Sequence, residues 1–146
     1  MTTTNLQMPD KETCAFCAYL LGQRPYTVLS RDDSVAILVT REQRGIPHVL
    51  VLPVRHTETV LDLADEDACA LMLGVRSAAR AIDKAYKRHG ISVWQNNGVP
   101  ANQSIQHVHF HVAGTLDTGG TAWGDVHELT VAETEVIAER LRPWLK

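Results

Sequence analysis

The sequence predicts an α+β domain in which a five-stranded antiparallel sheet packs against one long helix, with short helices near both ends. Five short segments are rich in β-branched and apolar residues. Most connections between them are short enough for antiparallel pairing. Between the third and fourth of these segments, apolar residues recur at spacings of three and four, as they do in an amphipathic helix.

The N-terminal part of the domain is predicted to contain a short helix and two strands. The helix covers residues 14–21 and ends before Gly22. Strands are expected at residues 26–29 and 35–39, with a polar hairpin turn at residues 31–34 between them. The helix therefore leads directly into a β-hairpin.

The third strand covers residues 48–52 and is ended by Pro53. The long helix is expected over residues 62–89, with Asp62 as its cap and Gly90 after its last turn. Acidic residues occupy its first turn and basic residues its last turn, where the helix dipole favours each charge.

The remaining elements are two strands and a last helix. The strands are expected at residues 91–95 and 105–113, with a polar loop between them. Thr130 and Glu133 have the spacing of a capping box, which predicts a helix that Pro143 ends. No repeat or shift in composition marks a second domain, so we expect one domain over residues 12–146 and a disordered tail over residues 1–11.

Composition excludes several classes of function. The 146 residues are 45% hydrophobic and 21% charged, with a net charge of −3. This balance argues against a nucleic-acid-binding protein, which needs a basic surface. No apolar run is long enough to span a membrane, and residues 1–8 do not have the order of a signal peptide. We therefore expect a cytoplasmic protein, and three cysteines without a secretion signal argue against a disulfide framework.

Three histidines stand at alternate positions, His107, His109 and His111, in the predicted fifth strand. Alternate side chains of a strand share a face, so the imidazoles are expected on one side, about 7 Å apart. Neutral imidazoles packed in a row lose solvation free energy. A fold that retains such a row therefore suggests that the histidines have a function. Three interpretations remain open: an exposed strand face, a zinc site, or nucleotidyl transfer with imidazole as the nucleophile. Amides and a hydroxyl at residues 95–98 and 102–104 favour phosphate and sugar binding over zinc.

These motifs resemble the hallmark of the histidine-triad (HIT) superfamily. The likeness covers roughly residues 14–113, and it is carried by residues 96–98, 103–106 and 107–112, with support from residues 14–17, 47–56 and 62–66. The resemblance implies the HIT-like fold and a homodimer with the sheet extended across the two-fold axis. It also implies a nucleotide hydrolase or nucleotidyl transferase that acts at the α-phosphorus of a nucleotide ester, anhydride or phosphoramidate, through a nucleotidyl-histidine intermediate.

The resemblance also implies roles for single residues. His109 matches the nucleophile, and His111 matches the histidine beside the leaving group. Residues matched to substrate binding are His48, Asn96, Gln103, Ser104 and Thr40. The family often has an acidic residue or asparagine at the position of Thr40, where it holds the ribose hydroxyls. Thr40 offers a single hydrogen bond there, and the following Arg41 is expected to reach a phosphate.

Cys14 and Cys17 form a CxxC motif, which alone indicates a redox pair, half of a metal site or two buried thiols. Some HIT proteins, and the related galactose-1-phosphate uridylyltransferases, pair such a motif with two histidines. The matching positions are His56 and His107, so the resemblance implies a structural zinc site and no catalytic cofactor. The alternative for His56 is an ordinary surface histidine in a turn.

Two other functions remain open. A metal-dependent hydrolase would use the histidine row as catalytic ligands, although residues 95–114 contain no Asp or Glu to serve as an acidic ligand or base. A non-catalytic nucleotide-binding module would keep its function without His109, whereas a HIT enzyme would lose turnover.

Overall fold

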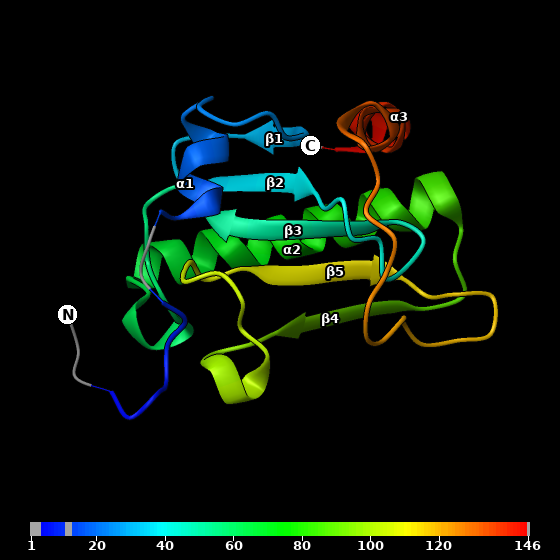
Figure 1. Cartoon of the computed structure of the whole chain (residues 1–146). Helices are drawn as coiled ribbons and strands as arrows, with labels where there is room; N and C mark the ends of the chain where they lie inside the picture. The colour runs from blue at the N-terminus through cyan, green and yellow to red at the C-terminus, as the bar shows by residue number, and fades with distance from the viewer. Residues whose placement is uncertain (1–3, 11–12, 146) are drawn as a thin grey trace.

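The structure is a computed structural model, and it describes residues 4–10 and 13–145. The predicted five-stranded antiparallel sheet is confirmed, with the strand order β1-β2-β3-β5-β4 (Figure 1). The strands are β1 (Val28–Arg31), β2 (Val35–Val39), β3 (His48–Pro53), β4 (Ile91–Gln95) and β5 (Phe110–Gly114). The order places β3 and β5 side by side in the interior of the sheet and leaves β4 at one edge.

Helices cover both faces of the sheet. The long helix α2 (Asp65–Tyr86) lies along one face, and the short α1 (Ala15–Leu20) lies on the other (Figure 1). The last helix, α3 (Val131–Leu141), packs near β1 and the end of α2. Short 3₁₀ turns are η1 (Val60–Asp62), η2 (Val99–Ala101) and η3 (Arg142–Trp144).

The two faces of β2 belong to two separate cores. Ile37 packs with the α2 core, whereas Leu38 packs with Phe16 of α1 on the opposite face. Because both faces are covered, the central strands are continuously apolar instead of alternating. Helix α2 approaches the sheet closely at Gly74, where a Cβ atom would lie 2.9 Å from a methyl carbon of Val51.

The predicted start of the fifth strand was wrong. Strand β5 begins at Phe110, so His107 and His109 precede it, and His111 alone of the three lies within it. The backbone N–H of Val108 donates to the Thr57 carbonyl at 2.7 Å instead of joining the sheet. The rings of His107 and His109 nevertheless lie on the same side of the chain, as expected, because Phe16 makes edge contacts with both of them.

Two other boundaries differ from the prediction. Strand β1 starts two residues later than expected, at Val28. Helix α2 is capped by Ala64, so the predicted cap Asp62 was wrong and lies in η1 instead. The helix ends at Tyr86 because Lys87 adopts the left-handed conformation, before Gly90 is reached. The predicted capping box that starts α3 is confirmed.

The N-terminal segment follows the surface beside the η2 turn. Residues 4–10 form neither helix nor strand, but the carbonyl of Gln7 accepts a hydrogen bond from the Val99 N–H at 2.6 Å. This part of the predicted tail therefore makes a defined contact, while residues 1–3 and 11 lie outside the described residues. Within the described part of the chain, no helix combines the length and apolar composition needed to cross a bilayer.

Candidate active site

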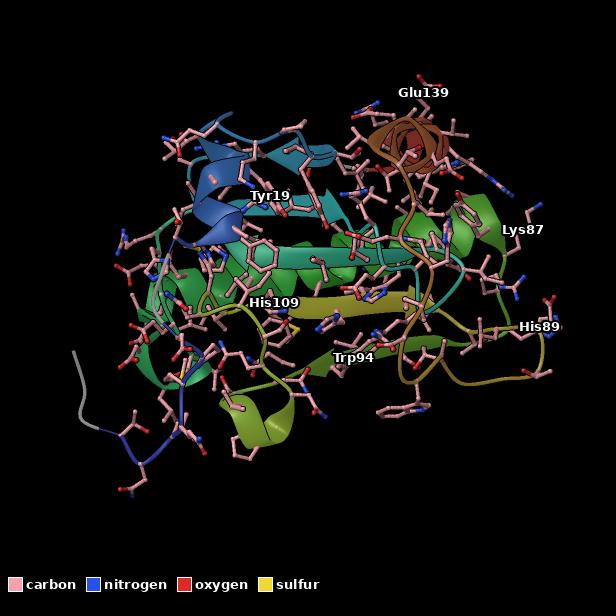
Figure 2. All side chains as sticks on the ribbon, in the orientation of Figure 1. Tyr19, Lys87, His89, Trp94, His109 and Glu139 are labelled. Carbon is pink, nitrogen blue, oxygen red and sulfur yellow. The ribbon has the colours of Figure 1, made fainter. Side chains whose placement is uncertain are left out.

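A cavity of about 130 Å³ opens on the α1 side of the sheet. Five of the predicted site residues line it together: His48, Thr40, Ser104, His109 and His111. They come from two regions that are distant in sequence, namely residues 40–48, from the end of β2 to the start of β3, and residues 104–111, from the loop before β5 into β5. Figure 2 shows His109 on the sheet beneath α1, in the region where Tyr19 projects from that helix.

A hydrogen bond to the neighbouring backbone selects one tautomer of the neutral His109 ring. Its Nδ1 lies 2.8 Å from the carbonyl oxygen of His107. A carbonyl oxygen can only accept a hydrogen bond, so Nδ1 carries the proton and Nε2 keeps its lone pair. Burial lowers the pKa of His109, and this keeps the ring neutral and nucleophilic at neutral pH.

His111 and His48 form a hydrogen-bonded pair beside His109. The Nε2 atom of His48 lies 3.0 Å from Nδ1 of His111. The Nδ1 atom of His48 meets both the N–H of Arg44 and the carbonyl oxygen of Glu42, each at 3.1 Å. One neighbour donates and the other accepts, so either tautomer of His48 has a partner. The proton between the two rings can therefore belong to either of them.

The pKa values of these two rings are strongly lowered. Burial is the main cause in both, bringing the pKa of His48 to about 4 and that of His111 to about 2. The guanidinium of Arg44, and His109 whenever it is protonated, oppose a positive charge on either ring and lower both pKa values further. All three imidazoles at the cavity are thus neutral at physiological pH.

Two of the predicted substrate-binding residues hold the loop and do not line the cavity. The Gln103 side chain is buried, and its Oε1 accepts from the Gly98 N–H at 2.7 Å. Its Nε2 donates to two backbone carbonyls, those of Glu58 and Ile105. Asn96 donates to the carbonyl of Ala101 at 2.7 Å. These bonds fix the loop that presents the exposed Ser104 to the cavity.

A family model for the HIT domain matches residues 22–117. The chain belongs to the HIT family. Protein hit of Bacillus subtilis is 33% identical over 115 residues, which cover 77% of this chain and 79% of that protein. The adenosine 5′-monophosphoramidase hnt1 of Schizosaccharomyces pombe is 34% identical over 102 residues, covering 68% and 72% of the two chains. A zinc-bound histidine triad family protein from Mycobacterium smegmatis matches in fold, with a TM-score of 0.77, 22% identity, and coverage of 90% and 92%.

Several residues that line the cavity of this HIT protein were missed by the sequence reasoning. An apolar wall is formed by Phe16, Tyr19, Tyr26, Leu50 and Ile105. The rings of Tyr19 and Tyr26 are stacked at 4.0 Å. The position of Phe16 between the two cysteines was the available signal, but its contact with His109 depends on the docking of α1. Arg41, expected to reach a phosphate, donates to the Leu129 carbonyl and pairs with Glu128 at 3.5 Å.

The predicted metal ligands converge in one group. The ligand atoms of Cys14, Cys17, His56 and His107 all lie within 4.8 Å of one another. The Nδ1 atom of His107 is 3.4 Å from the Cys14 sulfur, and its Nε2 donates to the Pro53 carbonyl at 2.8 Å. That bond keeps the Nε2 proton in place and directs the Nδ1 lone pair at the thiols. Two thiols and two imidazoles are one of the usual donor sets of structural zinc, so the residues fit this metal.

Proposed function

We propose that this HIT protein is a nucleotide hydrolase or nucleotidyl transferase, in which Nε2 of His109 attacks the α-phosphorus of a nucleotide ester, anhydride or phosphoramidate. The observation that carries the proposal is the bond between Nδ1 of His109 and the His107 carbonyl, which leaves a lone pair on Nε2 in a ring that lines the cavity. The similarity to an adenosine 5′-monophosphoramidase supports the same chemistry.

The reaction takes place in two displacements. In the first, a bond forms between Nε2 and phosphorus while the bond to the leaving group breaks; His111 donates a hydrogen bond from its own Nε2 to that group, which takes up a proton from solvent. In the second, a water attacks phosphorus and gives a proton to the His48–His111 pair, which passes it on to solvent, and His109 leaves. Because the proton between His48 and His111 finds a partner on either side, the pair is suited to both steps.

The other predicted substrate residues take two kinds of role. Ser104 is exposed at the cavity, and we place its hydroxyl on a phosphate oxygen, where a donor stabilises developing charge. Thr40 lines the same cavity and is the candidate for a ribose hydroxyl. Gln103 and Asn96 act through the loop that carries Ser104, and His48 acts through His111. The stacked tyrosines supply an aromatic surface for a base.

We further propose that Cys14, Cys17, His56 and His107 hold a structural zinc ion. The four side chains belong to three distant segments, so a metal bound by all of them would fix α1 against the sheet. When bound, zinc contributes folding free energy and stabilises the thiolate forms of the cysteines. It has no place in the chemical steps, because His109 meets the phosphorus without it. We expect the protein to act on small nucleotides in the cytoplasm.

We propose a homodimer that uses the edge strand β4. Val93 of this strand is 47% exposed, and Met72 and Leu73 of α2 are more than half exposed. A second copy that pairs along β4 would satisfy the open edge and cover apolar surface. Light scattering after size-exclusion chromatography should give twice the monomer mass. A Val93→Lys variant that remained dimeric would exclude this face.

The deciding experiment follows the protein mass during incubation with a nucleoside phosphoramidate and, separately, with a dinucleoside polyphosphate. The wild-type protein should gain the mass of one nucleotide and should release the nucleotide with turnover. The His109→Ala variant should gain no mass and lose activity by roughly four orders of magnitude, while still binding the nucleotide. The exposed His89→Ala variant is the matched control and should behave as the wild type.

The same experiment separates the two alternatives. Nucleotide binding without any adduct or turnover in the wild type would favour a binding module. Immediate loss of turnover on addition of a chelator, before any loss of folded protein, would favour a metal-dependent hydrolase.

A further inference from the structure

The indole of Trp94 is stacked on the imidazole of His111. The two residues are direct partners in the β4–β5 register, and their ring centroids lie 4.6 Å apart with planes only 3° from parallel. The same indole lies 5.2 Å from the ring of His48. Trp94 does not line the cavity at His109, so it is placed to act on the histidine pair and not on a substrate. Figure 2 shows Trp94 on β4, beside the strand β5 that carries His111.

The stack restrains the rotation of the His111 ring about its terminal torsion, which the hydrogen bond to His48 does not restrain. The terminal torsion of histidine is broad, so a single bond at Nδ1 allows the ring to rock about that contact. His111 also meets the ring of His109, with centroids 4.9 Å apart and an interplanar angle of 60°. The indole therefore prevents the His111 ring from tilting away from His109 toward β4.

The position of this ring decides whether His111 can serve the reaction. Its Nδ1 is bonded to His48, so Nε2 is the atom left for the leaving group or for water. Proton transfer needs this atom within hydrogen-bond reach of the reacting group. An aromatic face also attracts a neighbouring cation, which favours the imidazolium that forms when His111 takes up a proton.

We propose that Trp94 is a positioning residue that holds the His111 ring in its working orientation through the aromatic stack. The proposal rests on the function proposed above, because it assumes that His111 transfers a proton. It makes the identity of residue 94 a determinant of kcat, although this side chain never touches the substrate.

The test compares Trp94→Leu, which keeps apolar bulk without a π face, with Trp94→Phe, which restores an aromatic ring. Trp144→Leu, at an exposed position in η3, is the matched control. Trp94→Leu should lower kcat by roughly 10- to 100-fold and leave KM within about 2-fold, because a small misplacement of a catalytic group costs that much. Trp94→Phe should recover most of the loss, and Trp144→Leu should have no effect.

A second readout observes the His111 ring itself in long-range ¹H–¹⁵N spectra of ¹⁵N-labelled protein. In the wild type, the His111 nitrogens should give one set of signals, with Nδ1 shifted by its bond to His48. In Trp94→Leu these signals should broaden or move toward those of an unbonded ring, while the His89 signals stay unchanged.

The outcomes separate the two proposals. Wild-type kcat and wild-type His111 signals in Trp94→Leu would overturn the positioning role. A fall in kcat that follows the loss of thermal stability equally in Trp94→Leu and Trp94→Phe would overturn it as well. If the wild type fails to turn over nucleotides but the His111 signals change in Trp94→Leu, the proposed reaction fails and the positioning of His111 by Trp94 stands.

Discussion

The ring nitrogens of His109 are distinguished by one backbone atom. The His107 carbonyl accepts from Nδ1 at 2.8 Å, and this contact holds in place the tautomer that leaves Nε2 unprotonated. Burial lowers the pKa of the ring and so removes competition from the cationic form. The choice of tautomer and the lowered pKa both come from the surroundings of His109, and neither requires a further polar side chain.

Ser104 offers a test at the scale of a single atom. Its hydroxyl is exposed at the cavity, so Ser104→Ala should leave the free energy of unfolding within about 0.5 kcal/mol of wild type. Turnover should fall by roughly 10- to 100-fold, because a donor to the phosphate is lost. Steady-state kinetics and urea unfolding measure the two quantities. Ser34→Ala, in the exposed turn between β1 and β2, is the control, and equal kinetics for both variants would remove Ser104 from the site.

Residue-level prediction succeeded where the pattern is local and failed where contacts are distant. The alternation of histidines indicated that His109 and His111 lie close together, and both line one cavity, although only His111 is part of the strand. The stack of Trp94 on His111 could not be predicted, because it depends on the register between β4 and β5. Phe16 was missed for a similar reason, since it contacts His109 only after α1 docks on the sheet.

At the scale of an element, the loop before β5 depends on one buried amide. The Gln103 side chain makes three hydrogen bonds to backbone groups, so Gln103→Ala would leave buried donors and acceptors without partners. We expect a loss of about 1–3 kcal/mol in the free energy of unfolding, with a fall in turnover as the loop loosens. Urea unfolding measures the first effect. Gln23→Ala, at an exposed position, is the control, and a Gln103→Ala protein as stable as that control would show that the loop does not need this amide.

Element boundaries were predictable where apolar pattern and sheet pairing agree. The limits of β2 and β4 match the prediction, and β3 differs by one residue. The early part of the predicted fifth strand has the same apolar alternation, but the Val108 N–H bonds to the Thr57 carbonyl. A pattern in one segment does not reveal a competing hydrogen-bond partner 51 residues earlier in the chain. The start of α2 was misplaced because Asp62 enters a 3₁₀ turn first.

Helix α1 has only six residues, which is too short for a helix to be stable on its own. The proposed zinc ion would supply the missing stabilisation through Cys14 and Cys17. Treatment with a strong chelator should therefore lower the melting temperature by several degrees, and added Zn²⁺ should restore it. Calorimetry with measured zinc content checks this. The Cys17→Ser variant should start at the lower melting temperature and show no response to the chelator, whereas the exposed Cys69→Ser variant should respond as wild type. An unchanged wild-type melting temperature after zinc removal would contradict the metal site.

At the scale of the whole molecule, the sheet order determines which chemistry is possible. Placing β5 between β3 and β4 brings both His48 and Trp94 against the ring of His111. The same arrangement carries His107 to the cysteines at the start of α1. The proposed catalytic and metal-binding residues thus share one segment, and the His107 carbonyl that orients His109 belongs to a proposed metal ligand. No segment of the sequence alone contains this arrangement.

The buried imidazoles also make the stability of the whole fold depend on pH. The pKa of His48 is lowered to about 4 and that of His111 to about 2, from 6.5 in an unfolded chain. Below pH 6.5 the unfolded chain therefore binds more protons than the folded protein, so stability is complete above this pH and is lost as the pH falls. Each group should contribute a loss of up to about 1.4 kcal/mol per pH unit, until its folded pKa is reached.

Urea unfolding at intervals between pH 7.5 and 4.5 measures the slope. His48→Gln removes one of the two groups and should make the slope shallower, although its stability at neutral pH can also change. His89→Gln, at an exposed position, should leave the slope as it is in the wild type. Equal slopes in the wild type and His48→Gln would mean that His48 is not held neutral by burial, and the neutral His48–His111 pair on which the proposed proton transfer depends would have to be abandoned.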